Sequence, residues 1–224
     1  MAEKKGTAIM VVYTDVAVEH DADFNAWYNQ EHLPERLSNP GFLDGARYEA
    51  LRGGPRYLAV YELESVEALQ SEEYLRQRAN PTDWSKRMSP VMAAGGMVRN
   101  VYTQIYPAES DPHTLGRGMA PALQIGRMDV PPEIEDKYNY YYDNVRTPGN
   151  LKIPGCIQVR RYQSVDGWPK YLTMYEFEHE KVPETLAWER QRGQDEMHEY
   201  IGGTYGHASG SPGVYRRVFP SRAF

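Results

Sequence analysis

The sequence has few of the features that would assign a chain quickly to a class of protein. Its 224 residues include a single cysteine, Cys156, which excludes an internal disulfide and a zinc site built from several thiolates. Basic residues are in deficit, because 25 Lys and Arg face 31 Asp and Glu and give a formal net charge of −6. Binders of phosphate backbones or anionic membranes carry a basic stripe instead, so we expect neither nucleic acid nor a membrane as partner.

Long hydrophobic runs and a leader-like segment are also missing. A transmembrane helix needs about 20 consecutive apolar residues, whereas the apolar runs here, such as residues 10–13, extend over only a few positions. The polar residues 1–6 pass directly into a strand-like segment without the apolar core of a signal peptide. Together with the lone cysteine, this pattern predicts a cytoplasmic location.

Sequence motifs that hold common cofactors or nucleophiles are absent as well. The sequence contains no HExxH, no GxxxxGK[ST], no helix-opening GxGxxG and no GxSxG. We therefore expect no bound metal and no organic cofactor.

Tyrosine, in contrast, is abundant, with 18 Tyr against 5 Phe. A tyrosine combines an apolar ring with a polar hydroxyl, which suits a pocket for an aromatic ligand. Aromatic residues also fit the pleated surface of a strand, and composition alone favours this simpler explanation.

Two copies of one unit occupy most of the chain. After a shift of 114 positions, residues 7–65 lie over residues 121–179 without a gap, and 19 of these 59 positions are identical. A shift of 113 also pairs 101–107 with 214–220. Chance similarity rarely extends so far without an insertion, so we predict an internal duplication.

Each copy shows the pattern β-α-β-β-α-β of a ferredoxin-like unit, which predicts the fold class α+β. In the first copy we expect strands at about 7–14, 42–51, 56–64 and 97–106, a helix that Pro34 ends, and a second helical region over 66–92 with breaks near 80–81 and 89–90. In the second copy we expect elements at 121–129, 134–145, 156–165, 170–178, 183–201 and 213–219. The predicted domains are 1–106 and 121–224, joined by a linker at 107–120.

One such unit covers only one face of its sheet with helices. The other face needs a partner, and the second copy can supply it, so we expect the two sheets to pack face to face within one chain. Closure would also protect the strand edges that an open sheet exposes. A further homodimer remains possible.

Several segments of the first copy resemble the dimeric α+β barrel superfamily, and most closely its EthD-like branch. They are residues 24–35, Pro40-Gly41-Phe42, Arg47-Tyr48 and residues 57–62. The second copy is similar in pattern, so the resemblance implies a tandem fused barrel. Members of the superfamily share the fold but not the reaction. They include monooxygenases that need neither metal nor flavin, polyketide cyclases, lactone isomerases, dehydratases and decarboxylases, and a few branches bind haem.

The resemblance implies a pocket in each unit, between the sheet and its helices, for a small hydrophobic and often aromatic molecule. It places the recurrent histidine of the first helix at His32. In the alignment of the two copies, His32 corresponds to Arg146. Tyr28 lies four residues earlier on the same helical face. An imidazole exchanges protons near neutral pH and a phenol can donate to a developing oxyanion, so we predict that His32 and Tyr28 are catalytic.

Two alternatives for His32 stay open at this point. A position at the helix C-terminus would favour the charged imidazole, whereas burial would oppose it. His32 could also simply hydrogen-bond a loop carbonyl and end the helix.

Strand alternation and helical spacing suggest the residues that contact the ligand. Arg47 recurs as Arg161, so it either steadies an anionic or phenolic oxygen or makes a structural ion pair. Glu62 and Glu176 also recur, and we expect them to be structural. The predicted substrate-binding residues are Tyr13, Trp27, Asn29, Arg47, Tyr61 and Trp84.

The second pocket, with Tyr142 and Arg146, is expected to be degenerate or to bind an anionic group. An arginine is always charged and cannot serve as a general base. We therefore expect one active pocket per chain, in the first copy.

The leading functional hypothesis is an enzyme without a cofactor that performs acid/base chemistry on a small hydrophobic, aromatic molecule, as a lyase, dehydratase, isomerase or cyclase. The alternatives are a cofactor-independent monooxygenase of phenolic or polycyclic substrates, a non-catalytic barrel that binds aromatic ligands, and a haem protein.

Overall fold

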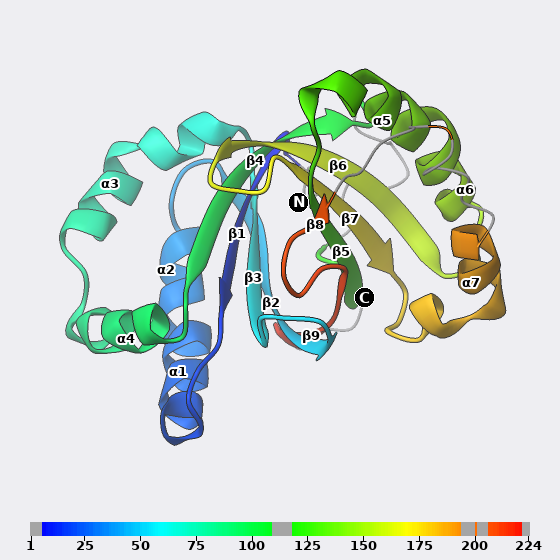
Figure 1. The fold of residues 1–224 in the computed structure, drawn as a ribbon. Coiled ribbons are helices and arrows are strands. Elements are labelled where there is room, and N and C mark those ends of the chain that lie inside the picture. The colour runs from blue at the N-terminus through cyan, green and yellow to red at the C-terminus, as the bar shows by residue number, and fades with distance from the viewer. Residues whose placement is uncertain (1–5, 109–117, 194–199, 201–205, 221–224) are drawn as a thin grey trace.

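A closed antiparallel barrel stands at the centre of the molecule, with helices on two opposite sides (Figure 1). The computed structural model describes residues 6–108, 118–193, 200 and 206–220. The strands are β1 Ala8–Thr14, β2 Phe42–Arg52, β3 Tyr57–Leu63, β4 Val98–Tyr106, β5 Ala122–Asp129, β6 Cys156–Asp166, β7 Tyr171–Phe177, β8 Gly206–His207 and β9 Gly213–Phe219. The helices are α1 Asp21–Trp27, α2 Leu33–Leu37, α3 Glu72–Ala79, α4 Asp83–Ala94, α5 Glu135–Tyr141, α6 Thr147–Leu151 and α7 Leu186–Gly193.

The two repeats form one continuous sheet. The strand order is β7-β6-β4-β1-β3-β2-β9-β5, and pairing of β5 with β7 closes the barrel. The short strand β8 pairs only with β5 and lies outside the ring. The two repeats pair with each other through β2–β9 and β4–β6, so both edge strands of each repeat are hydrogen-bonded to the other repeat. This arrangement confirms the predicted fold class and leaves no free edge in the ring.

The strands divide their side chains between two apolar layers. On β3, Tyr57, Ala59 and Tyr61 pack outward against the helices, whereas Leu58 and Val60 point into the barrel. This alternation is the period of two expected of a strand buried on both faces. A ligand site must therefore lie under the helices, because the interior is already filled. The interior layer includes Tyr13, Tyr48, Tyr102, Tyr162 and Tyr215.

A buried ion cluster joins the two repeats across the barrel. The guanidinium of Arg160 donates to the carboxylate of Glu62 and, through Nε at 3.0 Å, to Glu176 Oε1. All three side chains are at most 3% exposed. The two glutamates occupy equivalent positions in the repeats, whereas the counterpart of Arg160 is Ala46. Both glutamates are thus buried partners of a guanidinium, which agrees with the structural role expected for them.

The first helix differs from its prediction, because Pro34 does not end it. The peptide N–H of Leu33 bonds the carbonyl of Tyr28, five residues back, so residues 28–32 form a π-helical turn between α1 and α2. A widened turn moves the preceding carbonyls away from the proline ring and lets the helix continue to Leu37. The second repeat has the same π-helical turn at Tyr142–Arg146, before Pro148.

The second helical region was predicted correctly at one break and wrongly at the other. α3 ends at Ala79 and α4 begins at Asp83, which confirms the break at Asn80–Pro81. Pro90, however, lies inside α4 and does not interrupt it. The helix expected over 183–201 is observed as α7, and residues 194–199 and 201–205 lie outside the described part of the chain.

The linker expected at 107–120 is described only at its ends. Residues 109–117 lie outside the described part, while Met119 and Ala120 pack into the barrel interior. In the portion of the chain that the structure covers, no helix is long and apolar enough to cross a membrane.

Replacing Arg160 by Met should weaken the fold strongly, because it leaves two buried carboxylates without a cation. Removing one partner of a buried ion pair typically costs about 3–5 kcal/mol. We expect a decrease of this size in the free energy of unfolding, measured by urea titration. The matched control carries Glu62→Gln and Glu176→Gln in addition and should recover part of the loss. A decrease below about 1 kcal/mol for Arg160→Met would contradict a structural role.

Candidate functional site

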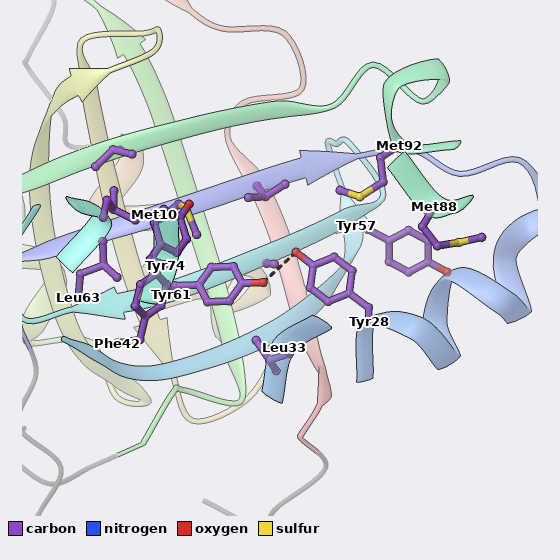
Figure 2. Close-up of a cluster of buried hydrophobic side chains, with 14 of the residues drawn as sticks. Met10, Tyr28, Leu33, Phe42, Tyr57, Tyr61, Leu63, Tyr74, Met88 and Met92 are labelled. Carbon is purple, nitrogen blue, oxygen red and sulfur yellow. Dashed lines mark hydrogen bonds between the residues drawn. The ribbon is translucent and has the colours of Figure 1, made fainter. Parts of the chain in front are cut away.

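A cavity of about 650 Å³ lies on the outer face of the first repeat, between its sheet and its helices. Met10 and Val12 of β1 and Met92 of α4 contribute apolar walls. Tyr28, Tyr61 and Tyr74 add aromatic rings from three different elements. Figure 2 shows the two tyrosines Tyr28 and Tyr61 pointing their hydroxyls toward each other beside this apolar cluster. The volume and the mixture of walls are typical of a small-molecule site.

His32 ends the π-helical turn and lies in the wall of this cavity. Its ring packs over Trp27, with centroids 4.4 Å apart and an angle of 30°, and meets Tyr28 edge-on at 4.9 Å. Its Nδ1 atom is shielded from solvent and has no hydrogen-bond partner among the described residues. The ring is therefore held in place by packing, and its Nδ1 is free of hydrogen bonds from the described residues.

The imidazole of His32 is neutral at physiological pH. Burial, together with the positive charges of Arg36 and Arg47, lowers its pKa from 6.5 to about 3. The competing effect of a helix C-terminus does not arise, because the helix continues to Leu37. The expectation that His32 exchanges protons near neutral pH in the free protein is thus wrong. Negative charge on a nearby ligand would raise the pKa of the ring and allow it to accept a proton.

Tyr28 and Tyr61 form a directed pair. The hydroxyl of Tyr61 donates to the oxygen of Tyr28 over 3.1 Å, and burial raises the pKa of both phenols. Both therefore stay protonated at neutral pH. Since Tyr28 accepts from Tyr61, its own O–H remains available to a third group in the cavity. Such a donor stabilises an oxygen that becomes negative during a reaction.

A polar chain between α1 and α4 supports the ring that lies over His32. The indole N–H of Trp27 donates to Ser85 Oγ at 3.2 Å. Glu31 Oε1 accepts hydrogen bonds from Thr82 at 2.5 Å and from Ser85 at 3.4 Å. This chain fixes Trp27 and so limits the orientations open to His32.

Arg47 and Asn29 do not line the cavity but fasten the first helix to the sheet. The guanidinium of Arg47 donates to Asn29 Oδ1 at 2.5 Å and to Asn25 Oδ1 at 2.8 Å. In the second repeat, Arg161 donates to Asn139 and Asp143 in the same way. Arg47 is thus held by hydrogen bonds to two asparagines and not by the ion pair considered for it. The ion pair occurs in the second repeat, between Arg161 and Asp143.

Tyr13 and Trp84 also lie away from the cavity walls. The ring of Tyr13 is in the barrel interior, with the guanidinium carbon of Arg127 at 4.5 Å from its centroid. The period of two had separated the strand into two sets without showing which set faces the helices. Trp84 packs partly buried against the outer core, and its indole N–H donates to Asp23 at 2.9 Å.

The second repeat carries larger side chains at the equivalent positions. Arg146, at the position of His32, donates through Nε to the hydroxyl of Tyr175 at 3.4 Å and lies 5.5 Å from the ring centroid of Tyr142. Trp188, at the position of Tyr74, packs edge-on against Tyr175 at 5.2 Å. The two halves are therefore chemically different where the first has its cavity.

The sequence reasoning missed all four cationic residues of the cavity, Arg36, Arg78, Lys86 and Arg99. Arg36 lies four residues beyond His32, so helical spacing would have found it had the helix not been expected to end at Pro34. Arg99 enters from the start of β4, and no local pattern marked it. Among the described residues, no three His, Cys, Asp or Glu side chains gather where they could hold a metal ion.

The low pKa of His32 has a measurable consequence. In a proton NMR titration between pH 5 and 8, we expect the ring signal that disappears in His32→Gln to keep the chemical shift of a neutral imidazole. The unfolded chain takes up this proton near pH 6.5 and the folded chain only near pH 3. His32 therefore makes stability fall as the pH decreases through that interval. A titration midpoint near 6.5 would contradict this burial.

The chain matches no protein-family model and no curated protein sequence. Its structure is similar to a candidate monooxygenase from Fusobacterium nucleatum, with a TM-score of 0.57 and 11% identity over 95% of this chain and 93% of the other. An anthrone oxidase-like protein gives a TM-score of 0.54 and 13% identity, over 97% and 94% of the two chains. A variant of the chlorite dismutase from Candidatus Nitrospira defluvii gives 0.56 and 11%, over 95% and 91%. At such identities the likeness establishes the fold: the chain is a dimeric α+β barrel built as two fused units.

Proposed function

We propose that this chain is an enzyme that removes a proton from a small hydrophobic, aromatic molecule held in the cavity of the first repeat. One observation carries the proposal. A neutral imidazole without protein partners, at His32, and an available phenolic O–H, at Tyr28, lie against the same apolar-walled space. A proton acceptor and an oxyanion donor on one ligand site are the parts that abstraction next to a carbonyl or on a phenol requires.

The proton transfer takes place in one step. An acidic C–H or O–H bond of the substrate breaks, its proton moves to His32, and the electron pair remains on the substrate as an enolate or phenolate. The oxygen of that anion accepts a hydrogen bond from Tyr28, whose position is fixed by Tyr61. The new negative charge also offsets Arg36 and Arg47, which otherwise depress the basicity of the imidazole.

The fate of the anion decides the reaction class. Return of the proton to another carbon gives an isomerisation, and loss of a leaving group gives a lyase or dehydratase reaction. We favour this class and, on the segment 24–35, an affiliation with the EthD-like branch of the barrel proteins. The proposal rests on the site, since the fold hosts many reactions.

A second candidate is a cofactor-independent monooxygenase. It begins with the same anion, which then reacts with molecular oxygen. The similarity of the chain to a candidate monooxygenase and to an anthrone oxidase-like protein favours this class as the runner-up. Consumption of oxygen in step with substrate loss separates it from the first candidate.

Anthrone is a suitable probe, because its acidic C–H bond reports deprotonation and its oxidation reports oxygen chemistry. We expect the protein to accelerate deuterium exchange of anthrone in D₂O without oxygen, measured by mass spectrometry. His32→Gln should reduce the acceleration at least a hundredfold and Tyr28→Phe by about the same factor.

The matched controls come from the second repeat. Arg146→Gln and Tyr142→Phe alter the equivalent positions and should leave the exchange rate unchanged. An equal loss in the controls would contradict a single active cavity. Binding of anthrone without exchange, unaffected by His32→Gln, would identify a non-catalytic binding protein. A Soret band that is shifted from that of free haem and elutes with the protein would identify a haem protein.

A further inference from the structure

The cavity of the first repeat has a one-sided charge. Four of its lining residues are cationic, namely Arg36, Arg78, Lys86 and Arg99, and none of those described there is an Asp or Glu. This segregation stands out in a chain whose net charge is −6. Cationic side chains around an apolar space raise the local concentration of anions and favour ligands that combine both properties.

Arg99 has a buried N–H group that no hydrogen-bond acceptor of the described residues reaches. Its Nη1 atom pairs with Asp166 at 2.8 Å, on the solvent side, where the aspartate is 66% exposed. Its Nε atom is buried and has no hydrogen-bond partner in the part of the chain that is described. A buried N–H of a charged group without an acceptor is costly, so such atoms are usually satisfied by protein, water or a ligand.

The neighbouring arginines, Arg78 and Arg36, form no close ion pair with a carboxylate of the described residues. Arg78 has no ion pair among the described residues and lies 5.9 Å from the ring centroid of Tyr74. Arg36 lies 5.6 Å from the same centroid, donates to Gln77 at 2.7 Å, and approaches Glu35 only to 3.7 Å. Tyr74 therefore has guanidinium groups near it from two helices, inside the cavity wall.

We infer that the ligand of this cavity is an amphipathic anion, an aromatic carboxylate whose ring lies among the apolar walls and whose carboxylate is bound by Arg99 with Arg78 beside it. The inference rests on the proposed function for the location of the site and adds the chemical class of its substrate. A guanidinium presents parallel N–H groups that match the two oxygens of a carboxylate. The aromatic part then lies against Met10, Met92 and Trp27, next to Tyr28 and His32.

The test compares two probes of equal shape, 2-naphthoate and the neutral 2-naphthamide, by isothermal titration calorimetry on the full chain. We expect the wild type to bind the carboxylate at least tenfold more tightly. Arg99→Gln and Arg78→Gln should each reduce the affinity for 2-naphthoate about tenfold or more and leave the affinity for 2-naphthamide nearly unchanged, which also shows that the variants are folded. Added salt should weaken the binding of the carboxylate alone.

Arg76→Gln is the matched control, since Arg76 lies on the same helix as Arg78 but outside the cavity lining. It should keep the full preference for the carboxylate. Equal affinities of the wild type for both probes, or an unchanged preference in both Arg99→Gln and Arg78→Gln, would overturn the inference and leave the proposed function standing. If neither probe binds the wild type, the cavity is not an aromatic site and both proposals fall. Tighter binding of 2-naphthyl phosphate would overturn the assignment to a carboxylate.

Discussion

Closure of the barrel is the constraint on which the rest of the structure depends. Because the edge strands of each repeat pair with the other repeat, every strand has an inner face that must be filled within this one chain. Tyrosine rings and the buried cluster of Glu62, Arg160 and Glu176 fill it. The cavity of the first repeat lies on the outer face of the sheet, under the helices. The position of the cavity thus follows from the topology.

Comparison of the two halves separates what the fold needs from what a ligand needs. The arginine that fastens the first helix to the sheet, its asparagine partner and the tyrosine beside them occur in both repeats with the same hydrogen bonds. The residues that differ include His32 and Tyr74, which line the cavity of the first half. Their counterparts in the second half, Arg146 and Trp188, both contact Tyr175. Duplication therefore provides an internal control, in which identity indicates architecture and divergence indicates the site.

The sequence predicted the fold well, because a gapless repeat and a clear period of two are properties of the chain itself. It predicted the site less completely, for reasons that are physical. The π-helical turn before Pro34 cannot be recognised from helix propensity, so Arg36 stayed hidden although it lies one turn beyond His32. Tyr13 was placed on the wrong face because alternation does not show which set points inward. The charge state of His32 depends on burial and on Arg47. Arg47 lies 15 positions away in the sequence, and only the fold brings it near the imidazole.

The buried cluster has a consequence for the history and the independence of the two halves. In an assembly of two identical polypeptides, each side chain near the twofold axis occurs twice, so a pair of facing carboxylates could meet either two guanidiniums or none. Here the pair meets one, because Arg160 has Ala46 as its counterpart. A dimer of identical chains cannot place an uneven number of charges at its symmetry axis, whereas a tandem with diverged halves can. A homodimer of either half alone would therefore not contain this cluster of two carboxylates and one guanidinium.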